Sequence, residues 1–305
     1  MATRTARMRS TIWFAAYATA CAVAFWASLR SLVQLALASD EYSHILIVPF
    51  ISIVLVWMER ERLFQTLEPN RSSAAVLFCV GALLGAFGWR SPSLSAGTDW
   101  LGLAILGFLC LIWAGFLFFY GTSAFKAGLF PLLFLLLMVP LPGFLLDRFI
   151  VWLQVGSADV AEWVFQLSGT PVLRQGLIFA LPRVTIEVAK ECSGIRSTQA
   201  LLITCLLAGH LFLRTNWRRT VLLAAAVPVL IIKNGVRIAT LTLLAVHVDS
   251  SFLTGHLHHN GGFVFFTLGM LILLPLLWWL QKTEAARLDR GGLPASAATS
   301  GTRPG

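Results

Sequence analysis

Long apolar segments are the feature that most limits how this chain can fold. A helix that crosses the hydrocarbon core of a bilayer needs about 20 predominantly apolar residues. Apolar residues make up 57% of the chain and charged residues 12%, about half the roughly 25% of a soluble domain. A soluble enzyme, a disordered protein and a secreted disulfide scaffold are excluded, and the sequence predicts an all-α polytopic membrane protein. The candidate spans are residues 11–37, 43–58, 74–90, 98–120, 124–142, 192–213, 220–246 and 262–281.

The basic residues predict how these spans are oriented, because Lys and Arg collect in cytoplasmic loops. They gather before the first span, after the second, between the sixth and seventh, and after the last, at Arg4, Arg7, Arg9, Arg60, Arg62, Arg71, Arg214, Arg218, Arg219, Lys282, Arg287 and Arg290. Both termini are then inside, which requires an even number of spans, about eight. The apolar but charged segment 144–168 is expected to lie at the outer face as an interfacial helix. The basic residues are dispersed, so no nucleic-acid partner is expected despite the net charge of +9.

The segment 171–190 differs from the rest of the chain. Val172 to Ile178 and Val184 to Val188 are rich in β-branched residues and flank Leu181-Pro182-Arg183, which predicts a short β-hairpin outside the bilayer. We expect a single membrane-embedded domain over residues 1–290. The Gly-, Ala-, Ser- and Pro-rich residues 291–305 are expected to form a disordered cytoplasmic tail.

Polar residues gather first around Cys192. If a helix starts near Cys192, then Cys192, Arg196 and Gln199 fall on one of its faces. A helix N-terminus and a nearby cation favour the thiolate, which is the nucleophilic form of cysteine. The alternative is a buried thiol beside an arginine that reaches the interface. No pair of cysteines has C-x-x-C spacing, so zinc and iron–sulfur sites receive no support.

A second polar group, Lys233 to Arg237, lies within the span 220–246. Arg237 is about 17 residues above the inner end of this span, or about 25 Å, near the outer edge of the hydrocarbon core. Asn234 and Arg237 are three residues apart and share a helix face. A charge inside a span indicates function by default. Arg237 could instead extend to the outer headgroups, and Lys233 is expected to do so or to pair with a carboxylate.

Histidines form the third group. His256, His258 and His259 lie between the last two spans, again on the outer side. They could bind a metal, but no Cys or acidic constellation accompanies them, so we expect no metal and no other cofactor. A single histidine acting as general acid and base beside Cys192 is the more economical interpretation. His44, which follows Asp40 and Glu41 at the outer face, could line the same site or belong to a solvated loop.

The three groups also resemble the signature blocks of a known family. Residues 191–197 (ECSGIRS), 234–237 (NGVR) and 258–263 (HHNGGF) resemble, in order and spacing, those of the exosortases, within the exosortase/archaeosortase family of membrane transpeptidases. Tyr42-Ser43-His44 resembles a further N-terminal block, with Ile45 where glycine is usual. The resemblance covers roughly residues 40–280.

The resemblance implies a function and roles for the site residues. Cys192 would be the nucleophile, Arg237 a proton donor or positioning cation, and His258 the third catalytic residue, with His256 and His259 as rivals. The substrate would be an exported protein with a PEP-CTERM-type C-terminal tail, cleaved at the periplasmic face of the bacterial inner membrane in connection with exopolysaccharide production. The tail helix of the substrate would be the partner, and the acceptor, which could be a lipid or polysaccharide, is unknown.

Two other interpretations stay open. A non-catalytic membrane component of polysaccharide export or polymerisation would work without a nucleophile. A metalloprotease using the histidine cluster would be silenced by chelation, whereas a thiol enzyme would be silenced by alkylation.

Overall fold

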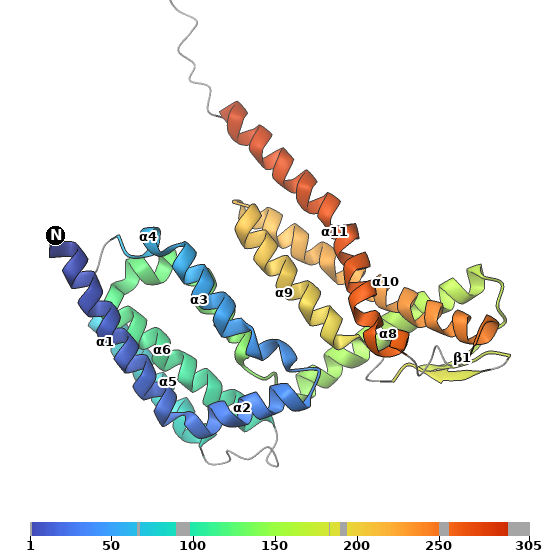
Figure 1. Cartoon of the computed structure of the whole chain (residues 1–305), viewed down its shortest axis with the longest axis horizontal. Coiled ribbons are helices and arrows are strands. Elements are labelled where there is room, and N and C mark those ends of the chain that lie inside the picture. Colours follow the sequence, from blue (N-terminus) through green and yellow to red (C-terminus); the bar gives the residue numbers. More distant parts are fainter. Residues whose placement is uncertain are drawn as a thin grey trace, which may run out of the picture. The chain divides into compact units, whose positions relative to one another are not determined.

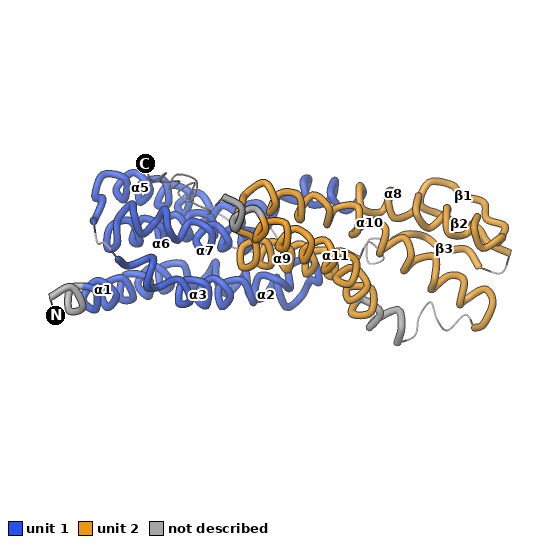
Figure 2. Tube along the Cα trace, turned by 90° about the horizontal axis from the view of Figure 1, so that it is seen from above, with its two compact units in different colours: residues 1–151 blue, residues 152–305 orange. Residues whose placement is uncertain are grey.

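The computed structural model describes residues 2–65, 68–89, 98–182, 184–189, 194–249 and 256–291, with the backbone alone over 2–6, 256–262 and 287–291 (Figure 1). The chain divides into two compact units, residues 1–151 and 152–305 (Figure 2). The expectation of one membrane-embedded domain over residues 1–290 stays a prediction.

Helices long and apolar enough to cross a membrane dominate the described residues, which confirms the all-α polytopic fold. There are 5 such helices, or up to 7 spans if each of two bent helix pairs counts as one. Five of the predicted spans correspond to the single helices α5 (Arg71–Gly88), α6 (Thr98–Ala127), α9 (Ile195–Phe212), α10 (Asn216–His247) and α11 (His256–Gly291).

The predicted first span, 11–37, is a bent pair. Helices α1 (Ala2–Ala24) and α2 (Trp26–Ala38) meet at 75°. The bend coincides with Phe25, whose ring occupies the space beside Gly85, since a Cβ built on that glycine would lie 2.6 Å from the ring. Hydropathy alone does not detect this bend.

The segment 43–58 is shorter than a span. It forms a 3₁₀ turn, η1 (Ser43–Leu46), and helix α3 (Val48–Met58), followed by the single turn α4 (Arg60–Leu63). Helix α3 has 11 residues. It is therefore about 16 Å long, against a hydrocarbon core of about 30 Å.

The predicted span 124–142 is also divided. Helix α6 breaks at Gly121, which has a φ of 88°, and it is followed by α7 (Leu129–Phe134) and η3 (Leu135–Met138). A Cβ at Gly121 would overlap the Glu68 carbonyl, so only glycine fits there. After η3 the chain turns by 91° into α8 (Gly143–Leu167). The placement of this 144–168 segment at the outer face stays a prediction.

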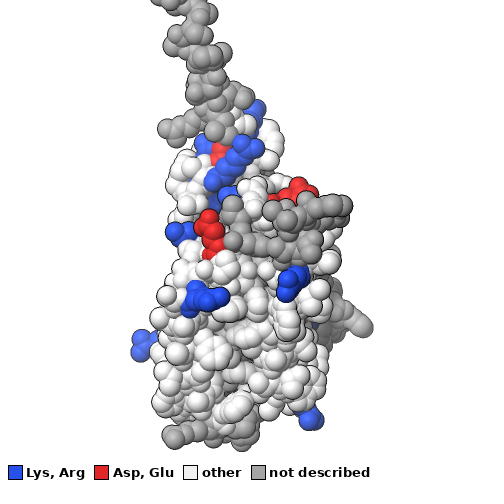
Figure 3. All heavy atoms as spheres, turned by 90° about the vertical axis from the view of Figure 1, so that its left-hand side faces the viewer, with Lys and Arg blue, Asp and Glu red and all other residues white. Residues whose placement is uncertain are grey.

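Unit 1 is built on a close contact between α5 and α6. A Cβ on Gly107 of α6 would lie 2.6 Å from the Gly85 nitrogen and 2.8 Å from the Gly81 oxygen of α5. Glycines at this spacing let two membrane helices approach backbone to backbone. On the face drawn in Figure 3, uncharged side chains cover most of the surface, as expected for helices in contact with lipid.

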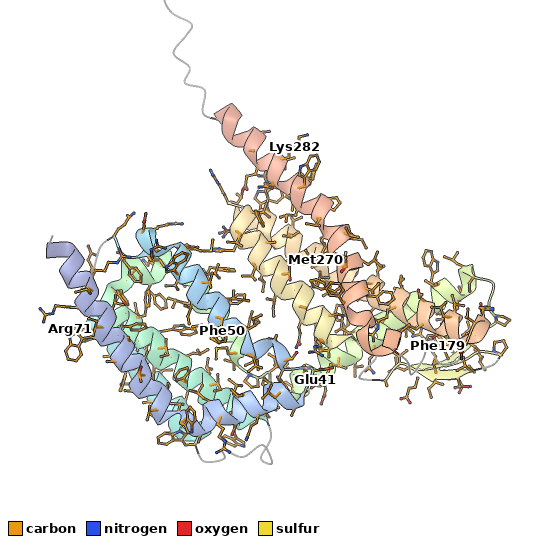
Figure 4. The ribbon with its side chains drawn as sticks, viewed as in Figure 1. Glu41, Phe50, Arg71, Phe179, Met270 and Lys282 are labelled. Atoms are coloured by element: carbon orange, nitrogen blue, oxygen red, sulfur yellow. The ribbon has the colours of Figure 1, made fainter. Side chains whose placement is uncertain are left out.

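Unit 2 contains the predicted β-structure, with one strand more than a hairpin. Strands β1 (Leu173–Gln175), β2 (Ile178–Ala180) and β3 (Thr185–Glu187) form an antiparallel sheet in that order. The first predicted β run is split by a turn at Gly176, whose φ is 65°. The sheet packs through Phe179 (Figure 4), whose ring centroid is 5.5 Å from that of Phe165 on α8.

An ion pair also joins the sheet to α8. Arg174 on β1 lies 2.8 Å from Asp159 and 2.7 Å from Glu162. Partial burial lowers the pKa of Arg174, but hydrogen bonds to these carboxylates outweigh burial and raise it. The sheet is thus held on α8 by both an apolar contact and a charged one.

A buried carboxylate on α11 contacts the end of α9 and the start of α10. Glu284 on α11 accepts hydrogen bonds from the backbone N–H groups of Arg214 and Thr215 and from the Thr215 hydroxyl. It also lies 3.4 Å from the buried guanidinium of Arg218. Glu284 therefore closes the turn between α9 and α10 from a third helix.

Candidate functional site

The start of α9 departs from its predicted position. The helix begins at Ile195, and its N-cap residue Gly194 has a left-handed backbone with φ 66°. This conformation does not continue a helix, so the expected start near Cys192 is wrong by three residues. Arg196 and Gln199 lie within α9, whereas Cys192, the first residue of the predicted helical face, lies outside the described residues.

Two of the sequence blocks singled out above meet at this turn. A Cβ on Gly194 would lie 2.4 Å from Oδ1 of Asn234 on α10, so the glycine backbone and the asparagine side chain are in direct contact. Asn234 is buried, and its Nδ2 donates to Ser157 Oγ on α8 at 3.0 Å. The Asn234 side chain therefore lies where the starts of the two blocks approach α8.

Lys233 lies beside this contact and does not behave as predicted. Its side chain is 1% exposed, so it does not extend to the interface. Within the described residues its ammonium donates to Ser197 Oγ at 2.5 Å rather than to a carboxylate. Ser197 Oγ in turn donates to the Gly194 carbonyl at 3.0 Å. Two side chains from α10 thus hold the first turn of α9.

Arg237 follows one turn after Lys233 on α10. It is 9% exposed, although it is charged and lies within a spanning helix. Asn234, three residues before Arg237, is also buried. Arg196, by contrast, is exposed at the start of α9.

Of the four candidate histidines, the structure describes the side chain of His44 alone. The backbone of His256, His258 and His259 belongs to the start of α11, and their side chains lie outside the described residues. His44 Nε2 lies 3.2 Å from the Leu137 carbonyl, so it joins η1 to η3 within unit 1. Among the residues that the structure describes, no group of three or more His, Cys, Asp or Glu could hold a metal.

Sequence reasoning missed the two serines of this cluster. Ser157 and Ser197 are buried partners of Asn234 and Lys233. The available signal was a hydroxyl inside an apolar helix, in the case of Ser157 next to Gly156 and Ala158. That signal is weak because serine also bonds within its own helix.

Comparison with protein families decides where the chain belongs. A family described as transmembrane exosortase matches residues 26–275, which is most of the chain. The chain belongs to the transmembrane exosortase family. This confirms the resemblance stated from the motifs, and with the apolar helices it identifies a multi-pass membrane protein of that family. Comparisons with curated proteins and with solved structures returned no match.

Proposed function

We propose that this exosortase-family protein is a membrane cysteine peptidase or transpeptidase that cleaves PEP-CTERM-type C-terminal sorting signals of exported proteins. The Cys192 thiolate attacks the carbonyl carbon of the scissile peptide bond. The tetrahedral intermediate collapses, the C–N bond breaks, the leaving amine takes a proton, and a thioester remains on Cys192. Water or an amine acceptor then attacks the thioester and releases the thiol.

One observation supports this proposal more than any other. Gly194 of the cysteine block contacts Asn234 of the arginine block, although the two residues lie on different helices. The contact lies two residues after Cys192 and three before Arg237 in the sequence. A nucleophile and a cation carried on adjoining segments are what acyl transfer requires.

The remaining roles follow from the chemistry. Arg237 would hold the developing oxyanion or donate a proton, and its burial would strengthen either interaction. His258 would protonate the leaving amine, with His256 and His259 as the alternatives. Arg196 would line the site rather than react.

The membrane setting suits a substrate that is itself anchored. The C-terminal tail helix of an exported protein presents its cleavage point at the outer face of the inner membrane, so the site would face the periplasm. The acceptor is unknown, and a lipid or polysaccharide would be in keeping with a link to exopolysaccharide production. The spans would form the surface along which the tail helix docks.

Substrate processing in cells tests the proposal. The protein is expressed with a tagged PEP-CTERM-tailed substrate, and substrate size is followed on a gel for the wild type, Cys192→Ala and Cys192→Ser. Cys205→Ala, a buried cysteine of α9, is the matched control. We expect shortening with the wild type and Cys205→Ala and none with either Cys192 variant. Equal shortening with all of them would overturn the nucleophile assignment.

The same assay separates the two rival functions. Single alanine variants of His256, His258 and His259 identify the histidine on which cleavage depends. Loss of cleavage with a thiol-alkylating reagent but not with a chelator supports the thiol enzyme. The reverse result would favour a metalloprotease. Intact polysaccharide export with Cys192→Ser, when no cleavage occurs even with the wild type, would favour the non-catalytic component.

A further inference from the structure

Lys233 is a buried cation that the proposed reaction does not use. It lies in the middle of α10, a helix long and apolar enough to span the membrane, and it is 1% exposed. A charged side chain inside a membrane is costly, and such residues mark functional sites by default. Arg237 lies four residues further along the same helix, and its like charge adds to the cost of burying Lys233.

The contacts of Lys233 lead toward the start of α9. Its ammonium donates to Ser197 Oγ at 2.5 Å, and Ser197 Oγ donates to the Gly194 carbonyl at 3.0 Å. Its aliphatic stem packs on α11, since a Cβ on Gly269 would lie 3.5 Å from Lys233 Cδ. The side chain is thus fixed along its length, and its charged end is committed to one hydroxyl.

We propose that Lys233 and Ser197 form a positioning pair that holds the left-handed turn at Gly194 and thereby aims the Cys192 thiol, two residues upstream. This inference rests on the proposed function, because it assigns a role to residues that act through the nucleophile. The pair fixes the carbonyl of Gly194, and Asn234 Oδ1 packs directly against the α-carbon of the same residue. A small misplacement of a reacting group costs about 100-fold in rate.

If Lys233 only stabilised the fold, Lys233→Met would lower the melting temperature and the rate of substrate processing together. The positioning role predicts a different result. Replacing a buried charged side chain by an apolar one of similar volume is often neutral or stabilising. Methionine matches the length of the lysine stem. Lys233→Met is therefore expected to keep or raise the thermal stability of the protein while the rate of substrate processing falls.

The test measures the rate of substrate processing and the melting temperature for matched variants. Lys233→Met, Ser197→Ala and the double variant remove the pair, and Lys233→Arg and Ser197→Thr keep a donor and an acceptor. Lys282→Met is the control, since Lys282 is exposed on α11 (Figure 4). Cys192→Ala marks the rate without a nucleophile. Membrane abundance of each variant is checked by immunoblot.

We expect Lys233→Met to process the substrate about 100-fold more slowly with no fall in melting temperature. Ser197→Ala should be similarly slow but less stable, because it leaves the buried Lys233 ammonium without its acceptor. The double variant should be no slower than the slower single variant, because the two residues act as a unit. Lys233→Arg and Ser197→Thr should recover to within about 10-fold of the wild type, and Lys282→Met should match it.

Three results would overturn the inference, and they distinguish its failure from failure of the proposed function. Wild-type processing by Lys233→Met, where Cys192→Ala is inactive, would remove the positioning pair and leave the proposed function intact. The same conclusion follows if the rate of Lys233→Met falls only in step with its melting temperature. Wild-type processing by Cys192→Ala would overturn the proposed function and this inference with it.

Discussion

Replacement of Gly194 by alanine should be among the most damaging single-methyl additions in unit 2. Gly194 has a φ of 66°, a left-handed conformation that costs a non-glycine residue about 1–2 kcal/mol. The new Cβ would lie 2.4 Å from Asn234 Oδ1, and crowding of this kind in a packed core costs about 1–3 kcal/mol. The two effects together predict a loss of about 2–5 kcal/mol in the free energy of unfolding.

Gly169→Ala separates the two effects. Gly169 has nearly the same backbone, with a φ of 68°, but a Cβ there would meet nothing within 4 Å. It should lose only the backbone contribution of about 1–2 kcal/mol. Thermal unfolding of both variants in detergent, followed by tryptophan fluorescence, measures the difference, and the processing assay measures activity.

The comparison is decisive in either direction. A larger fall in melting temperature for Gly194→Ala, with processing lost in that variant and kept in Gly169→Ala, is the expected result. Adding Asn234→Ala to Gly194→Ala should recover part of the lost stability, because it removes the crowding. Equal melting temperatures for the two glycine variants would refute the claim that Asn234 packs against the start of α9.

Two further predictions concern buried polar groups of unit 2. Glu284→Ala leaves the buried Arg218 without its carboxylate and should cost about 3–5 kcal/mol, measured as a fall in melting temperature; an unchanged melting temperature would contradict the buried pair. Thr198 and Thr242 are both buried, but within the described residues Thr198 Oγ1 has no hydrogen-bond partner, whereas Thr242 Oγ1 donates to the Ile238 carbonyl at 2.8 Å. Thr198→Val should therefore raise the melting temperature by the equivalent of about 1 kcal/mol, and Thr242→Val should lower it by a similar amount. A lower melting temperature for Thr198→Val than for Thr242→Val would contradict these assignments.

Hydropathy predicts the class of fold well because the bilayer sets the length of a spanning helix. It predicts helix breaks poorly when their cause is a tertiary contact. At the bend of the first span, Phe25 packs against Gly85, which lies 60 residues away in the sequence and on another helix. The break at Gly121 depends likewise on the carbonyl of Glu68. The additional strand had a local signal, Gly176, which divides the first β run.

The candidate site was likewise predictable from the sequence only in part. The sequence predicts that Asn234 and Arg237 share a helix face inside a span, but it leaves open whether Arg237 is buried or extends to the headgroups. The hydrogen-bond partner of Lys233 cannot be predicted from the sequence. Ser197 lies on another helix, α9, and comes within reach of Lys233 only when the two helices pack together. The start of α9 was misplaced because Ser193, Gly194 and Ile195 offer no strong helix signal, and the turn is stabilised by Ser197 and Asn234 after folding.

The contacts of Glu284 also impose an order on biosynthesis. The backbone groups of the turn between α9 and α10 bond to a carboxylate that is made 69 residues after Thr215. At about 5–20 residues per second, the ribosome completes this turn roughly 3–14 s before its partner. Until then Arg218 and the open N–H groups of the turn have to be solvated by water or lipid headgroups, so the turn between α9 and α10 is incomplete until Glu284 is made. Insertion of the last helix is therefore the step that completes unit 2 during synthesis.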